Sequence, residues 1–223
     1  MSTPLTIDAD AVLWSVPAGQ RVGRPLLVLL HGYGSNEQDL FGLAEHLPER
    51  YVVASLRAPG SNSFGYEWFS LGGELAGPRG HQQTVTTDRL REEGANRAAE
   101  AVRAWLDGLE KFTSVGLGGF SQGGAIAVQV LRQDPERVAF AANLSGFVAP
   151  GELDGDAVLA ERRPPVLWAR GDADQVIAPF LIERTAAWLP GHSALTDRVY
   201  PGLGHGISAQ TLTDLVAFLD ARD

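Results

Sequence analysis

The sequence contains no cysteine, and this absence removes several kinds of chemistry at once. Disulfide bonds, thiolate nucleophiles, iron–sulfur clusters and cysteine-ligated zinc sites all require thiol groups, so all of them are excluded. The absence leaves the cellular compartment open, because a chain without thiols tolerates an oxidising or a reducing environment.

Positive charge and long apolar runs are also scarce. The chain carries 18 Lys and Arg against 27 Asp and Glu, a formal net charge of −9. Such a chain is repelled by phosphate backbones and anionic membranes, so nucleic acid is not an expected partner. No basic and apolar leader opens the sequence, and no apolar run approaches the length of a bilayer span. We therefore expect a soluble cytoplasmic protein without stable membrane insertion.

What the chain does contain is typical of a globular protein. Apolar residues make up 44% of the sequence and charged residues 20%. A length of 223 residues is ordinary for one α/β domain with a large core. We expect residues 1–223 to form a single domain.

Two apolar patterns alternate along the chain. Helical spacing joins Ala98, Val102, Trp105 and Leu109, then Ile126 and Val130, and finally Leu212, Leu215, Val216 and Leu219. Short continuous apolar runs, typical of buried strands, stand at 25–30, 51–56, 114–120, 138–145 and 164–169, with a less certain one at 197–201. This alternation predicts an α/β fold with a mostly parallel central sheet and helices on both faces.

The stretch 60–88 is the one long region without either pattern. It contains six glycines and the aromatic residues Phe64, Tyr66, Trp68 and Phe69. Long loops in compact domains are often functional, so we expect 60–88 to form a lid or a pocket wall. A surface excursion pinned by its aromatic residues is nearly as good an explanation.

The segment GGFSQGGA, residues 118–125, places Ser121 between glycines after one apolar run and before one helical pattern. Gly119 to Gly123 fit G-x-S-x-G, the pattern of a nucleophile elbow. In that turn the serine adopts a strained backbone, and only glycine two residues to either side leaves room. A serine helix cap is the simpler alternative. The flanking patterns favour a nucleophile.

A serine nucleophile needs a base, and His205 is the best placed of the five histidines. It lies in the glycine-rich segment YPGLGHGIS, after the last strand-like run and before the last helix. An imidazole in such a loop can lean over the edge of the sheet. We expect His46, His81 and His192 to face solvent instead.

The imidazole in turn needs a carboxylate to fix its tautomer. Asp172 and Asp174 both follow the strand-like run at 164–169, and spacing alone does not choose between them. The chain order of serine, aspartate and histidine is that of an α/β-hydrolase. Three loops at the carboxyl ends of strands would then converge on one crevice.

Backbone N–H groups for an oxyanion would come from two places. One is Gln122, directly after the serine, and the other is the loop after the first buried strand, within 29–40. His31 stands at the end of that strand. We interpret His31 as a structural residue whose ring nitrogens brace the loop.

These segments together resemble the phospholipase/carboxylesterase family of α/β-hydrolases, which includes the acyl-protein thioesterases. The resemblance extends over almost the whole chain, from LLVLLHGYGSN through RAP, EWFS, GLGGFSQGGAIA and LSGF to RGDADQVIAP and YPGLGHGIS. It implies Asp174 as the catalytic carboxylate beside Ser121 and His205. It also implies the N–H groups of Tyr33 and Gln122 as oxyanion donors. The matching segments supply four candidates for the substrate pocket, Trp68, Phe69, Phe147 and Val176.

The activity implied is that of a serine hydrolase that cleaves small carboxylic esters through an acyl-enzyme and needs no metal or organic cofactor. An acyl-protein thioesterase or a lysophospholipase is an alternative within the same chemistry, so the substrate is an ester or an acyl thioester. A non-catalytic binding protein of this fold is the alternative from another class. The chain departs from the family pattern at Arg170, usually histidine, and at Ser70, usually aspartate. A homodimer is left open.

Overall fold

The structure, a computed structural model, describes residues 4–71, 81–109 and 112–222, with residues 81–90 as backbone only. Its centre is a seven-stranded sheet in the order β1-β3-β2-β6-β7-β8-β9. Only β1 runs antiparallel to its neighbour; the other pairs are parallel. The strands are β1 (Leu13–Trp14), β2 (Leu26–Leu30), β3 (Val52–Leu56), β6 (Val115–Phe120), β7 (Val138–Leu144), β8 (Pro165–Gly171) and β9 (Ala194–Tyr200).

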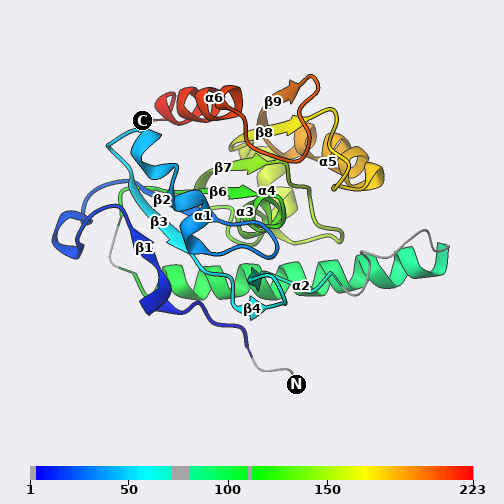
Figure 1. Cartoon of the computed structure of the whole chain (residues 1–223), viewed down its shortest axis with the longest axis horizontal. Helices are drawn as coiled ribbons and strands as arrows, with labels where there is room; N and C mark the ends of the chain where they lie inside the picture. The colour runs from blue at the N-terminus through cyan, green and yellow to red at the C-terminus, as the bar shows by residue number, and fades with distance from the viewer. Residues whose placement is uncertain (1–3, 72–80, 110–111, 223) are drawn as a thin grey trace.

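Helices follow the strands and cover both faces of the sheet (Figure 1). One face packs against α2 (His81–Asp107), α3 (Gln122–Gln133), α4 (Gly155–Arg162) and α5 (Pro179–His192). The other face packs against α1 (Glu37–Phe41) and α6 (Ala209–Asp220). Within the described residues, three short 3-10 helices complete the connections, Ala9–Ala11, Ala18–Gln20 and Ala44–His46.

The strand β2 shows why its sequence is apolar throughout. Leu26, Val28 and Leu30 contribute to the core under α2 and α3, whereas Leu27 and Leu29 contribute to the core under α1 and α6. Successive side chains of a strand point to opposite faces, so a strand covered on both sides needs apolar residues at every position. The predicted α/β fold with a mostly parallel sheet and helices on both faces is confirmed.

All six apolar runs form strands, but the sequence did not predict the shortest strands. The strands β1, β4 (Gly60–Ser61) and β5 (Tyr66–Glu67) have two residues each, too few for a period to be visible. The strand β9 begins at Ala194, earlier than its apolar residues suggest, because this edge strand is mostly half-exposed or exposed. Edge strands tolerate polar residues that a central strand would not.

The stretch 60–88 is not one irregular loop. It begins with the β4–β5 hairpin, and α2 starts at His81 and ends at Asp107, before Leu109. The first turns of α2 carry the polar sequence HQQTVTT, which has no apolar period and so gave no helical signal. Residues 72–80 lie outside the described residues. Among the helices described, none combines the length and the apolarity needed to cross a membrane.

Candidate active site

Ser121 forms the turn between β6 and α3. Its backbone has φ 54° and ψ −118°, a conformation that a residue with a side chain rarely adopts. A Cβ atom at Gly119 would lie 2.2 Å from the carbonyl oxygen of Gly123. A Cβ at Gly123 would lie 2.0 Å from that of Leu30. The glycines are therefore sterically required, as the sequence predicts for a nucleophile elbow.

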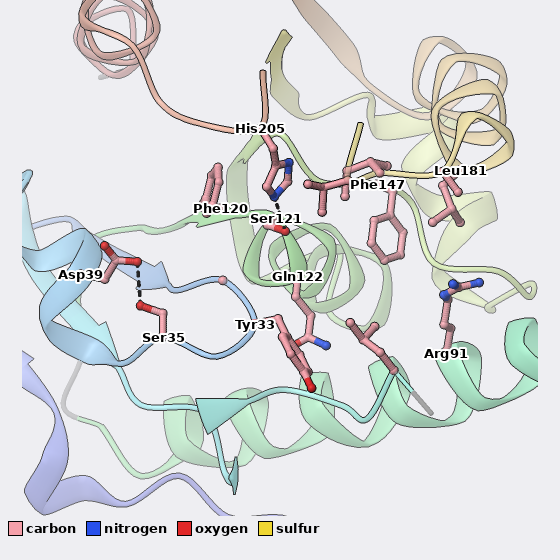
Figure 2. Close-up of a pocket in the computed structure, with 15 residues that line it drawn as sticks. Tyr33, Ser35, Asp39, Arg91, Phe120, Ser121, Gln122, Phe147, Leu181 and His205 are labelled. Atoms are coloured by element: carbon pink, nitrogen blue, oxygen red, sulfur yellow. Dashed lines mark hydrogen bonds between the residues drawn. The ribbon is translucent and has the colours of Figure 1, made fainter. Parts of the chain in front are cut away.

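His205 joins Ser121 to Asp174 through its two ring nitrogens. The distance from Ser121 Oγ to His205 Nε2 is 2.9 Å, and that from His205 Nδ1 to Asp174 Oδ2 is 2.7 Å. A carboxylate only accepts hydrogen bonds, so the proton sits on Nδ1 and Nε2 accepts from the serine hydroxyl. The side chains come from the loops after β6, β8 and β9, and Figure 2 shows His205 directly above Ser121.

Asp174, rather than Asp172, contacts the imidazole. The side chain of Asp174 is 2% exposed, and its Oδ1 accepts hydrogen bonds from the backbone N–H groups of Val176 (2.8 Å) and Ile177 (3.2 Å). These bonds fix the orientation of the carboxylate. Asp172 is exposed and accepts a hydrogen bond of 2.6 Å from Gly202 N. It therefore braces the loop that carries His205.

The two predicted oxyanion donors flank Ser121. Gln122 is the first residue of α3, where a backbone N–H has no acceptor within the helix. Tyr33 lies in the turn after β2 and, like Gln122, lines the cavity described below. The turn is held by Gly34, which has φ +74° and whose N–H donates to Tyr66 O at 2.8 Å. These positions agree with the expectation for both residues and leave their role to be tested.

The side chain of Gln122 has a structural function that the sequence did not indicate. Its Oε1 accepts a hydrogen bond from Trp68 N (2.8 Å), and its Nε2 donates to Phe69 O (2.7 Å). The indole N–H of Trp68 donates to His31 O at 2.8 Å. The segment after β5 is thereby tied to both loops that carry the oxyanion candidates.

His31 is fully buried, and both its ring nitrogens are bonded to backbone. Nδ1 lies 2.7 Å from Gly32 O, and Nε2 accepts from Ala58 N at 3.1 Å. Burial holds the pKa of His31 below its usual value, because an imidazolium ion would lose its hydration. The interpretation of His31 as a structural residue that braces the loop is confirmed.

The remaining histidines differ from one another. The side chain of His46 is 54% exposed, as expected. For His192 the expectation is wrong: its ring is half-buried and stacks on Trp188 with a centroid separation of 3.9 Å. A histidine in the last turn of a helix can fold back onto that helix, which sequence spacing alone did not reveal. The side chain of His81 lies outside the described residues.

A cavity of about 420 Å³ opens in front of Ser121. Phe147 and Val176 line it, as the sequence predicts. Trp68 and Phe69 do not; they are 1% and 5% exposed and pack in the core behind Gln122. The sequence missed Arg91 and Leu181, which line the cavity from α2 and α5 (Figure 2). No motif marks these helix positions, because only the packing of the helices brings them to the cavity.

The departure at Arg170 has a structural explanation. The guanidinium carbon of Arg170 lies 3.3 Å from the ring centroid of Trp168, and the group forms an ion pair with Asp197 on β9. Arg170 is not among the residues that line the cavity. It therefore ties β8 to the edge strand.

Known proteins similar to this chain include esterases and thioesterases. A probable carboxylesterase of Oryza sativa subsp. japonica is 29% identical over 97% of this chain and 84% of the relative. Acyl-protein thioesterase 1 of Eremothecium gossypii is 25% identical over 87% of this chain and 86% of the relative. The crystal structure of esterase PE8 superposes with a TM-score of 0.74 at 28% identity, covering 98% of this chain and 99% of that one.

The family model described as Phospholipase/Carboxylesterase matches residues 14–222. The matched range contains Tyr33, Ser121, Gln122, Asp174 and His205. The chain therefore belongs to the phospholipase/carboxylesterase family.

Proposed function

We propose that this protein is a carboxylesterase whose nucleophile is Ser121. The observation that carries the proposal is the continuous hydrogen-bonded series from Ser121 Oγ through His205 to Asp174, with distances of 2.9 and 2.7 Å at a cavity. Membership in a family with esterase relatives supports the reaction class.

The reaction proceeds in two acyl transfers. Ser121 Oγ attacks the ester carbonyl while His205 Nε2 takes the hydroxyl proton, and the tetrahedral intermediate collapses when the alcohol leaves with that proton. The acyl group is then an ester of Ser121. Water attacks this ester and gives a proton to His205. The second tetrahedral intermediate then collapses, His205 returns the proton to Ser121 Oγ, and the carboxylic acid is released.

Asp174 stays ionised throughout and stabilises the imidazolium form of His205. The backbone N–H groups of Tyr33 and Gln122 hold the negative oxygen of each tetrahedral intermediate. Losing one such donor typically raises the barrier by about 3 kcal/mol. Every bond made and broken in this scheme is served by the protein itself, so no step uses a metal or an organic cofactor.

Acyl-protein thioesterase or lysophospholipase activity would use the same residues, since a thioester carbonyl is attacked in the same way. One relative is named an acyl-protein thioesterase, which keeps this second candidate in view. A binding protein without chemistry would have no need of a serine held in a strained turn against a histidine. The single domain and the cytoplasmic location stay predictions, and the homodimer stays open.

The test is the hydrolysis of p-nitrophenyl esters from acetate to palmitate by the wild type and by Ser121→Ala. We expect kcat/KM of the variant to fall by roughly 10⁴-fold or more, because the nucleophile is lost. Ser63→Ala, which alters an exposed serine on the β4–β5 hairpin, is the control and keeps full activity.

Chain length separates the candidates. A maximum at short acyl chains supports a carboxylesterase of small esters, and rising activity toward palmitate supports the thioesterase or lysophospholipase. Full activity in Ser121→Ala contradicts the proposal. Labelling of the wild type but not of Ser121→Ala by a fluorophosphonate gives an independent readout of an activated serine.

A further inference from the structure

Arg91 is the feature of the cavity that simple ester hydrolysis does not require. It projects from α2 toward Phe147 and Leu181, on the other side of Ser121 from Asp39 (Figure 2). Among the described residues that line the cavity, Arg91 alone carries a permanent positive charge. The cavity therefore has a cation at one end of a space that also holds the nucleophile.

The guanidinium of Arg91 lies over an aromatic ring. Its carbon lies 5.7 Å from the ring centroid of Phe180, and that of Arg184 lies 5.8 Å from the same centroid. Phe180 precedes Leu181, which lines the cavity, whereas Arg184 does not line it. Contact with the ring already restricts the side chain of Arg91, so binding a ligand costs less conformational entropy.

The wall near Arg91 is apolar. Phe147 and Leu181 lie on the same side of the cavity as Arg91 (Figure 2) and are 4% and 3% exposed. Ile177 also lines the cavity and is 8% exposed. A charge beside such a wall interacts strongly with an opposite charge, because little water screens the pair. A purely aliphatic acyl chain would displace water from the guanidinium without replacing the hydrogen bonds that the water had made. A ligand with an apolar body and an anionic end matches both features.

A guanidinium has more donors than one anionic group needs. A guanidinium presents five N–H groups in a planar fork, and two of them match the oxygens of one carboxylate or phosphate. The other donors stay available for the protein. One bound carboxylate or phosphate therefore uses only two of the five donors.

Asp39 defines the direction in which an anionic substrate lies. Its exposed carboxylate lines the cavity beside Ser35, whose hydroxyl donates to it at 2.7 Å. An anion is repelled from this end and attracted to Arg91. The ester bond then lies between them, at Ser121.

We propose that the enzyme prefers esters that bear an anionic group, a carboxylate or a phosphate, and that Arg91 is the residue that selects them. This inference rests on the proposed function of Ser121. The anion stands either on the acyl group or on the alcohol, and the experiment distinguishes the two.

The test compares matched charged and neutral esters by pH-stat titration. Monomethyl suberate and methyl octanoate place the charge on the acyl side. On the alcohol side, 2-(butanoyloxy)ethyl phosphate is compared with 2-methoxyethyl butanoate. The variants are Arg91→Gln, Arg91→Lys and, as the matched control on the same ring, Arg184→Gln.

In at least one pair we expect Arg91→Gln to lower kcat/KM of the charged ester roughly tenfold or more, and that of the neutral ester less than about twofold. The affected pair identifies the side of the anion. Arg91→Lys should recover part of the preference because it keeps the charge but not the fork. Arg184→Gln should leave the charged-to-neutral ratio unchanged.

Equal losses on charged and neutral esters in Arg91→Gln, or an unchanged ratio in both pairs, overturn the inference. Neither result affects the proposed function as long as neutral esters are hydrolysed by the wild type and not by Ser121→Ala. Loss of that serine dependence would instead overturn the proposed function itself. Far-ultraviolet circular dichroism of each variant confirms that it is folded.

Discussion

His31 and His205 occupy similar places in the fold, but His31 bonds to backbone groups and His205 bonds to side chains. Both lie at the carboxyl end of the sheet, one after β2 and the other after β9. The ring nitrogens of His31 are bonded to Gly32 O and Ala58 N, whereas those of His205 are bonded to Asp174 and Ser121.

The difference shows what makes a histidine able to work as a base. Backbone groups cannot give up or accept a proton near neutral pH, so the ring of His31 can only brace them. The side-chain hydroxyl and carboxylate beside His205 can respectively release a proton and stabilise the resulting cation. His31 is also fully buried, while the side chain of His205 is 15% exposed and borders the cavity.

The largest expected effect tests the carboxylate that distinguishes the His205 region. In Asp174→Asn we expect kcat to fall roughly 10⁴-fold, because an amide can hold the imidazole in the wrong tautomer. Asp172→Asn is the matched control. Its exposed side chain accepts a hydrogen bond from Gly202 N, which an amide oxygen can also accept, so kcat should change less than about threefold. Steady-state kinetics on p-nitrophenyl acetate measures both. Similar losses in the two variants would contradict the assignment of Asp174.

The second prediction tests the structural role of His31. We expect His31→Ala to lower the free energy of unfolding by about 2–4 kcal/mol, because a buried carbonyl and a buried N–H lose their partners and a cavity is left. Urea unfolding followed by tryptophan fluorescence measures the change.

His46→Ala is the control for that measurement. The side chain of His46 is 54% exposed, so its loss should change the free energy of unfolding by less than about 0.5 kcal/mol. If His31→Ala keeps wild-type stability but loses as much activity as Asp174→Asn, the structural role assigned to His31 is contradicted.

The smallest expected effect concerns pH. Burial places the folded-state pKa of His31 below the ordinary value of 6.5, so the unfolded chain binds the proton more readily. The contribution of neutral His31 to stability is therefore fully present above about pH 6.5 and declines as the pH falls below it. The slope is at most about 1.4 kcal/mol per pH unit.

The pH effect is measured as a difference between two proteins. The free energy of unfolding of the wild type minus that of His31→Ala should become smaller as the pH is lowered from 7.5 to 5.5. The effects of the other titrating groups are the same in both proteins and cancel in this difference. A difference that stays constant or grows over this range would show that His31 is not held neutral by burial.

The parts of the site that the sequence predicted share a local cause. Ser121 stands in a turn between a strand and a helix. A side chain at either flanking glycine would collide with nearby backbone atoms, so glycine must occur at fixed distances from the serine in the sequence. The expected strands at 25–30 and 114–120 were visible for a similar reason, since burial on both faces demands an unbroken apolar run.

The parts that were missed depend on contacts between distant segments. Arg91 reaches the cavity because α2 packs beside α3, and no local pattern marks that position. Trp68 and Phe69 were expected at the pocket because they stand in the matching segment EWFS, within the irregular stretch 60–88. The structure buries both behind Gln122, whose side chain bonds to their backbone.

The sequence by itself determined the fold class, the strained turn at Ser121 and the order of serine, aspartate and histidine. These features follow from burial patterns and backbone sterics, which act over a few residues and leave regular spacings. The tertiary structure decided between Asp172 and Asp174, which spacing had left open although the family resemblance implied Asp174, and it alone showed that Arg91 lines the same cavity as Ser121. Each of these features depends on a contact between two segments that lie far apart in the chain. The free energy of such a contact depends on both segments, so the pattern of either one alone does not predict it.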